Sequence, residues 1–217
     1  MVGILGGTFD PIHLGHIEPA FDLLRALPLQ EIRFVLVQIP SHRDLPGASA
    51  KHRWRMLELA LKGKPSLIAD DRELRREGPS YTVDTLLDLR AQLGEAQTLC
   101  LIVGADTFAN FTSWHRWQDI LQLANLVVTT RPGAQLPSTG AAAELLNERR
   151  CGAPQDLTHI DSGAILLQTV QRLDISATTI REGLAAGRDV STMLPEAVWC
   201  YIHKHGLYGA TSSETAI

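Results

Sequence analysis

The chain has 217 residues, of which 45% are hydrophobic and 20% are charged, a balance typical of a folded α/β unit with a sizeable core. Its formal net charge of −4 argues against a duplex nucleic-acid binder, because such proteins carry a basic face. The first residues lack the basic and long apolar segments of a signal peptide, and no apolar run reaches the roughly 18 residues of a membrane span. The three cysteines form no metal-binding pattern. We therefore expect a cytoplasmic protein with neither nucleic acid nor membrane as a partner.

Short apolar runs alternate with helical patterns along the chain. The predicted strands cover residues 2–5, 32–39, 66–69, 98–103, 126–130 and 164–170. The predicted helices cover residues 14–27, 51–61, 80–93, 115–124, 176–186 and 195–205, and residues 133–153 give at most a loose helix between loops. Ser80 or Thr82 is the expected N-cap of the third helix, and Ser176 that of the fifth. This alternation predicts a Rossmann-like α/β fold, a doubly wound parallel sheet with helices on both faces.

We expect one domain over residues 1–209, in which residues 174–209 form a C-terminal helical subregion, followed by a frayed tail at 210–217. Doubly wound sheets bind ligands beyond the carboxyl ends of their strands, where the strand order reverses. Polar segments that follow the predicted strands should therefore converge on one rim of the sheet.

The first of these segments begins at Gly6 and reads G-G-T-F-D-P-I-H-L-G-H. Gly6 and Gly7 allow a tight turn and a close approach by a phosphate or a ribose. His13 and His16 lie three residues apart at the start of a helix, so they share a face. A helix N-terminus offers free N–H groups and positive potential, and Gly15 leaves room for a nucleotide against the helix. The segment therefore predicts a polyphosphate site.

This string resembles the signature of the nucleotidyltransferase superfamily that is related to class I aminoacyl-tRNA synthetases. The resemblance implies that His13 and His16 contact the phosphates of ATP, and that His16 stabilises the charge on the α-phosphate during transfer. The ATP-binding residues expected from this part of the chain are Gly6, Gly7, Thr8, Phe9, His13, Gly15, His16, Gly104 and Asp106.

A second motif, D-I-S-A-T-T-I-R, opens another helix and ends at Arg181. Ser176 is a natural N-cap, and the hydroxyls of Thr178 and Thr179 can meet phosphate oxygens together with the first-turn amides. Arg181 carries a planar charged fork suited to phosphate. The motif resembles the I-S-[ST]-T-x-I-R element with which the superfamily grips the triphosphate, although Ala177 removes one hydroxyl. Arg181 completes the expected catalytic set with the two histidines.

The middle of the chain resembles bacterial nicotinate-mononucleotide adenylyltransferases. The resemblance rests on P-S-Y-T-V-D-T-L from Pro79, on G-A-D-T from Gly104 and on F-T-S-W ending at Trp114, and it extends over nearly the whole chain to a final G-L-Y. It implies transfer of the adenylyl group of ATP to nicotinic acid mononucleotide, giving deamido-NAD and pyrophosphate in NAD biosynthesis. The contacts expected for the mononucleotide are Thr8, His42, Arg43, Ser80, Tyr81, Thr82, Asp106 and Trp114.

These residue types suit a pyridine ring that carries a carboxylate. Trp114 offers a flat surface for stacking, with a place in the core as the alternative, and the helix start near Ser80 offers N–H and O–H donors. Asp106 can accept from ribose hydroxyls or lie near a metal. The loop with His42 lacks the proline pair usual before that histidine, and Arg53 is either a similar contact or a solvated helix arginine.

The implied reaction needs no general base, because a phosphate monoester with a second pKa near ~6 is already largely dianionic at neutral pH. Catalysis then rests on positioning and on charge stabilisation. Mg²⁺ is expected on the substrate phosphates and waters, without a metal motif in the protein. Nicotinamide mononucleotide or another phosphate acceptor, a non-catalytic nucleotide sensor, and the oligomeric state remain open.

Overall fold

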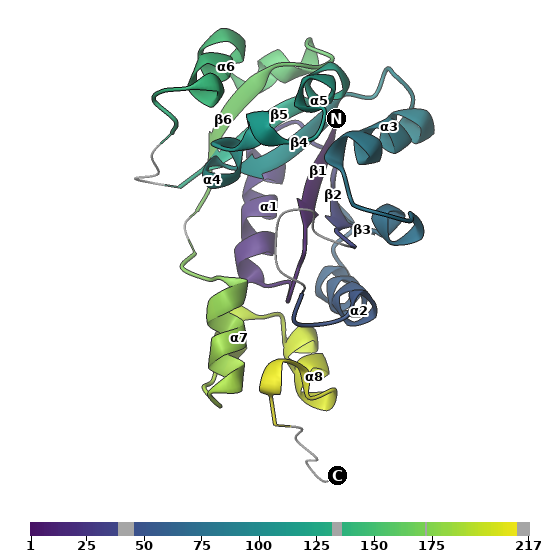
Figure 1. Cartoon of the computed structure of the whole chain (residues 1–217), viewed down its shortest axis with the longest axis vertical. Helices are drawn as coiled ribbons and strands as arrows, with labels where there is room; N and C mark the ends of the chain where they lie inside the picture. The colour runs from purple at the N-terminus through teal and green to yellow at the C-terminus, as the bar shows by residue number, and fades with distance from the viewer. Residues whose placement is uncertain (39–45, 132–135, 172, 212–217) are drawn as a thin grey trace.

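The computed structural model describes residues 1–38, 46–131, 136–171 and 173–211. Within these residues, parallel strands form one sheet in the order β3-β2-β1-β4-β5-β6 (Figure 1). The strands are β1 (Val2–Gly7), β2 (Glu31–Leu36), β3 (Leu67–Asp70), β4 (Leu99–Gly104), β5 (Asn125–Thr130) and β6 (Ile165–Thr169). The order reverses between β1 and β4, which confirms the predicted doubly wound, Rossmann-like sheet.

Helices follow or connect these strands. They are α1 (Leu14–Ala26), α2 (Ala50–Leu61), α3 (Thr82–Leu93), α4 (Ala105–Phe108), α5 (Trp117–Leu123), α6 (Ala141–Arg149), α7 (Ala177–Ala185) and α8 (Glu196–Lys204). Short 3₁₀ helices include η1 (Arg72–Arg75) and η5 (Leu207–Gly209). None of the helices in the described part of the chain has the length and apolar content that a membrane crossing requires.

Side chains that alternate along each strand build a separate core on each face of the sheet. In β2, Phe34 packs into the core that includes α1, α2, α7 and α8, whereas the next residue, Val35, packs into the core with α3, α5 and α6. Full burial of a side chain such as Phe34 contributes about 2–3 kcal/mol relative to exposure. Helices therefore cover both faces, as predicted.

Several element boundaries differ from the prediction. The helix expected from residue 80 begins at Thr82, and neither Ser80 nor Thr82 caps it, because Tyr81 occupies the N-cap position. Tyr81 makes no side-chain cap hydrogen bond. The helix expected from residue 115 begins at Trp117 because the preceding Arg116 has a left-handed backbone with φ of 53°. Within residues 133–153, where at most a loose helix was expected, the structure has the regular helix α6.

The C-terminal elements lie at one end of the sheet, below β1 and α2 in Figure 1. There α8 packs against α2, and η5 packs against α7. Ser176 caps α7 as predicted, since its hydroxyl accepts a 3.1 Å hydrogen bond from the Thr179 amide. Most of the tail expected at 210–217 lies outside the described residues. This arrangement puts the second motif close to the carboxyl ends of the central strands.

Candidate functional site

The two motifs meet at the carboxyl end of β1, next to the reversal of strand order. A Cβ built on Gly6 would meet nothing within 4 Å, so this glycine borders open space. A Cβ on Gly7 would lie only 2.6 Å from the ring of Phe9. Gly7 is therefore needed by the protein's own packing, whatever it also does for a nucleotide.

Phe9 shapes the site from beneath. Its ring is only 2% exposed and packs against Phe34, with ring centroids 5.6 Å apart. It also meets the His16 ring edge-on, with centroids 5.2 Å apart. Its backbone is left-handed with φ of 45°, a conformation that costs a non-glycine residue about 1–3 kcal/mol and that the buried ring holds in place. The buried side chain of Phe9 therefore positions His16 and does not itself face a nucleotide.

The imidazoles of His13 and His16 lie together at the start of α1, with ring centroids 3.8 Å apart. The His13 backbone N–H donates to Nδ1 of His16 over 3.3 Å. An Nδ1 that accepts a hydrogen bond leaves the proton of a neutral imidazole on Nε2, so His16 presents an Nε2–H donor. The predicted shared face of the two histidines is confirmed.

Burial, and to a smaller extent the positive charge of Arg131, together lower the pKa of His13 to about 4. Burial also lowers the pKa of His16, with His13 as the second cause. Both rings are therefore neutral at neutral pH when no anion is bound. Arg131 follows β5 at the same edge of the sheet and is exposed, so it is a further phosphate-binding candidate. The sequence contains one indication of this role, because Arg131 directly follows a predicted strand, where a ligand-binding residue is expected.

Gly15 brings the two motifs into contact. A Cβ at this position would lie 2.9 Å from Nδ1 of His13 and 3.2 Å from the carbonyl oxygen of Ile175. The segment before α7 thus packs directly on the first turn of α1. His13 and Ile175 therefore occupy part of the space that Gly15 was expected to leave for a nucleotide. Contact of Gly15 with ATP stays a prediction.

The start of α7 turns its hydroxyls outward. Ser176, Thr178 and Thr179 are all exposed, and the Ser176 and Thr179 hydroxyls lie 2.8 Å apart. Arg181 is 35% exposed at its side chain and donates from Nη1 to the backbone oxygen of Asp10 over 2.7 Å. The first-turn amides, three hydroxyls and one guanidinium thus surround the N-terminus of α7, beside the histidine pair.

Asp10 joins the first motif to two distant segments. Its buried carboxylate accepts hydrogen bonds from the amides of Gly47 (2.7 Å) and Ala48 (3.0 Å). It also accepts one from the hydroxyl of Tyr208 at 2.7 Å. Nothing in the sequence around Asp10 indicates partners from the far end of the chain.

Arg53 is not a solvated helix arginine, since only 1% of it is exposed. Its guanidinium donates to the carbonyl oxygens of Thr8 (2.8 Å), Val37 (2.7 Å), Gln38 (3.0 Å) and Ala48 (3.2 Å). It therefore fixes the first motif and the segments on either side of residues 39–45 to one another. The predicted contacts His42 and Arg43 lie outside the described residues.

The segment expected to receive the pyridine ring carries an aromatic cluster. The Tyr81 ring lies against His115 with centroids 4.3 Å apart, and Trp114 packs beside Phe111 at 5.5 Å. Trp114, Ser80, Tyr81 and Thr82 are all half-buried, which leaves part of each accessible. Gly104 and Asp106 are exposed at the end of β4, and a Cβ on Gly104 would meet open space.

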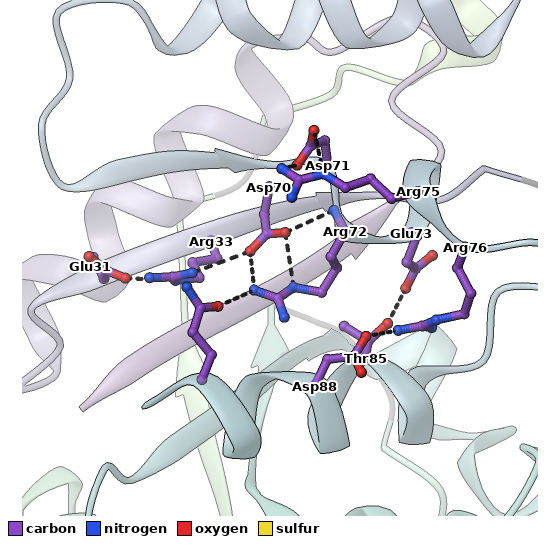
Figure 2. Close-up of polar contacts among 11 residues, drawn as sticks. Glu31, Arg33, Asp70, Asp71, Arg72, Glu73, Arg75, Arg76, Thr85 and Asp88 are labelled. Carbon is purple, nitrogen blue, oxygen red and sulfur yellow. Dashed lines mark hydrogen bonds and ion pairs between the residues drawn. The ribbon is translucent and has the colours of Figure 1, made fainter. Parts of the chain in front are cut away.

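The buried carboxylate of Glu73 contacts the start of α3 (Figure 2). Glu73 accepts a 2.6 Å hydrogen bond from the Thr85 hydroxyl, so it ties η1 to the first turns of α3. Burial raises the pKa of Glu73. With its amide oriented to satisfy both neighbours, Gln38 donates to the carbonyl oxygens of Glu73 and Arg76 at 2.8 Å each.

Comparison with known proteins gives a consistent result. Residues 4–183 match the cytidylyltransferase-like family model. A probable nicotinate-nucleotide adenylyltransferase of Cellvibrio japonicus is 46% identical over 207 residues, covering 95% of this chain and 98% of the relative. One of Halorhodospira halophila is 46% identical over 208 residues, covering 96% and 95% of the two chains.

Solved structures share the fold. The nicotinic acid mononucleotide adenylyltransferase of Plasmodium falciparum, determined in complex with NaAD, superposes with a TM-score of 0.72 at 18% identity and covers 96% of this chain and 97% of its own. A nicotinate-nucleotide adenylyltransferase structure from Vibrio parahaemolyticus gives a TM-score of 0.62 at 16% identity, with 95% and 94% of the chains covered. Motifs, fold and full-length relatives together show that the chain belongs to the cytidylyltransferase-like family and, within it, to the nicotinate-nucleotide adenylyltransferases of NAD biosynthesis.

Proposed function

We propose that His13, His16 and Arg181 carry out adenylyl transfer from ATP to nicotinic acid mononucleotide, giving deamido-NAD and pyrophosphate. The observation that carries this proposal is the pair of neutral imidazoles at the start of α1, packed against the segment that opens α7. Two helix N-termini and their polar side chains then face one anionic ligand, which suits a triphosphate.

In the proposed reaction, a phosphate oxygen of the mononucleotide attacks the α-phosphorus of ATP. A new P–O bond forms, the bond to the bridging oxygen of the β-phosphate breaks, and pyrophosphate leaves with the electron pair. The Nε2–H of His16 donates to the α-phosphate as charge develops there, and His13 and Arg181 hold the leaving phosphates. Ser176, Thr178 and Thr179 add donors at the N-terminus of α7.

The backbone of residues 6–9, Gly15 and the end of β4 at Gly104 form the proposed remainder of the ATP site. On the other side, Trp114 stacks on the pyridine ring, and the start of α3 at Tyr81 and Thr82 receives the carboxylate. Ser80, just before that turn, adds a hydroxyl donor for the mononucleotide. Thr8, Asp106 and the loop residues His42 and Arg43 complete the proposed set as ribose and phosphate contacts.

Mg²⁺ fits this site as a companion of the substrate phosphates. Among the described residues, three or more His, Cys, Asp or Glu side chains do not gather around a possible metal position. Mg²⁺ commonly takes one carboxylate together with phosphate oxygens and waters, and the exposed Asp106 at the end of β4 can supply that carboxylate. When bound, the ion would neutralise phosphate charge.

We also propose that residues 1–209 act as one domain in which residues 174–209 complete the phosphate site, and that the protein works in the cytoplasm, where its substrate ATP is abundant. The deciding experiment measures pyrophosphate release from ATP and Mg²⁺, with nicotinic acid mononucleotide and nicotinamide mononucleotide supplied in separate reactions. Strong preference for the acid supports the proposed carboxylate site. Preference for the amide would overturn that site while keeping the reaction, and no release with either would contradict the proposal.

A further inference from the structure

Tyr208 reaches the first motif from the far end of the chain. It lies in η5, and its hydroxyl donates a 2.7 Å hydrogen bond to Oδ1 of Asp10, 198 residues earlier in the sequence. Its backbone is left-handed with φ of 58°, so the main chain is held in a costly conformation that directs this ring. The ring also touches Gly47, where an added Cβ would lie 3.3 Å from Cε1 of Tyr208.

The same carboxylate has a competing partner in Arg181. Oδ2 of Asp10 lies 3.8 Å from Nη1 of Arg181, which donates instead to the backbone oxygen of Asp10 at 2.7 Å. The two charged groups are thus close without forming a direct short hydrogen bond. The carboxylate is held where it is by three donors, namely the amides of Gly47 and Ala48 and the phenol of Tyr208.

We propose that Tyr208 is a positioning residue for adenylyl transfer, whose hydroxyl holds the Asp10 carboxylate back from Arg181 so that the remaining N–H donors of the guanidinium stay available to the triphosphate. This inference rests on the proposed function, in which Arg181 holds phosphate. The neutral phenol takes up part of the anion's hydrogen-bonding capacity without adding a competing charge. Burial and the adjacent Asp10 raise the pKa of Tyr208, so it remains a donor throughout the working pH range.

Loss of the hydroxyl leaves one lone-pair direction of the buried carboxylate without its donor. With only the amides of Gly47 and Ala48 left as donors, the carboxylate gains by moving closer to the nearby cation of Arg181. Arg181 would then be turned toward Asp10 and away from an incoming triphosphate. The expected signature is weaker use of ATP with unchanged use of the mononucleotide.

The test uses Tyr208→Phe with Tyr201→Phe as its matched control. Tyr201 lies in α8 of the same C-terminal subregion, and its hydroxyl also makes one side-chain hydrogen bond, 3.0 Å long, to Nδ1 of His52 outside the site. We expect Tyr208→Phe to lower kcat/KM for ATP by about tenfold while KM for nicotinic acid mononucleotide changes by less than about twofold. Tyr201→Phe should leave both constants within about twofold of the wild type. Equal behaviour of the two variants would overturn the inference.

A double-mutant cycle with Arg181→Gln separates positioning from general weakening of the fold. If Tyr208 acts through Arg181, adding Tyr208→Phe to Arg181→Gln should cost little more than Arg181→Gln alone. Additive losses would show that the hydroxyl acts elsewhere and would overturn the inference. Normal ATP dependence in Arg181→Gln, with an active wild type, would instead refute the proposed phosphate role of Arg181, and the inference would fall with it.

Discussion

The imidazole rings of His13 and His16 lie 3.8 Å apart between centroids, with their planes inclined by 32°. At this separation two imidazolium charges repel strongly, and His13 is buried as well. Protonation of the pair is therefore costly in the free protein and becomes favourable when an anion lies beside it. The site is built from neutral donors that gain charge-assisted strength only as negative charge arrives.

The first prediction concerns acid stability. His13 has a pKa of about 4 in the folded protein, against a usual value of 6.5, so the unfolded chain binds more protons between these values. The contribution of His13 to stability is complete above about 6.5 and is lost as the pH falls toward about 4, by about 3 kcal/mol at most. His13→Asn should therefore show a smaller loss of unfolding free energy between pH 7 and pH ~4.5 in urea titrations. Parallel curves for the two proteins would contradict the burial argument.

The second prediction separates turnover from binding at His16. If its Nε2–H meets charge that develops only during transfer, His16→Ala should lower kcat by roughly 10²–10³ and change ATP affinity by less than about tenfold. Single-turnover kinetics and equilibrium binding of ATP measure the two quantities. Equal losses in both would mean that His16 binds ATP only in its ground state.

A third prediction follows from the burial of Arg53. Arg53→Met leaves four carbonyl oxygens without their donor, so we expect a loss of roughly 2–4 kcal/mol in unfolding free energy and a fall in activity. Arg55→Met on the same helix is the control, because Arg55 is exposed and paired only with Glu58. It should change stability by less than about 0.5 kcal/mol. Similar losses in both variants would contradict the anchoring role of Arg53.

The fourth prediction concerns Glu73. Its folded pKa is raised, so the protonated carboxyl group contributes stability below its unfolded pKa near 4.5, and this contribution is lost as the pH rises through the folded value. Glu73→Gln keeps an acceptor for the Thr85 hydroxyl without a buried charge, and it should be as stable as the wild type or more stable at pH 7. Glu73→Ala removes the acceptor and should be less stable and raise KM for the mononucleotide. Melting temperatures across pH, with steady-state kinetics, measure both effects.

The fifth prediction addresses the pyridine site. Trp114→Ala should raise KM for nicotinic acid mononucleotide by about tenfold, since a stacked aromatic ring contributes about 0.5–1.5 kcal/mol beyond its buried area, and leave KM for ATP nearly unchanged. Trp117→Ala is a suitable control because Trp117 packs on the same Phe111. If Trp117→Ala raised KM for the mononucleotide and Trp114→Ala did not, the pyridine ring would not stack on Trp114, and the prediction would be wrong.

Much of this molecule could be predicted from local patterns. Apolar runs that end at glycine or proline located the strands, and the contact between His13 and His16 follows from helical spacing alone. The helix cap at Ser176 is likewise local. The cap of α3 was predicted wrongly because the helix begins between the two candidates, with Tyr81 at the N-cap position and no side-chain cap hydrogen bond.

Other features depend on contacts that no local pattern carries. Arg53 is buried because carbonyl groups from three separate segments converge on it, and their convergence exists only in the folded sheet. The partners of Asp10 are equally remote, since one follows the second strand and another lies at the end of the chain. The influence of Arg131 on His13 likewise comes from the end of β5, which β4 separates from β1 in the sheet.

The position of β1 at the reversal of strand order also bears on synthesis of the protein by the ribosome. β1 emerges first and can pair with β2 early, but its other edge must wait for β4, which is made only after β3 and α3. The turn after β1, which we propose binds phosphate, meets the second motif later still, when Ile175 arrives to pack on Gly15. A nascent chain therefore exposes one edge of its central strand until β4 is made, and the proposed nucleotide site forms only after the segment before α7 has been synthesised.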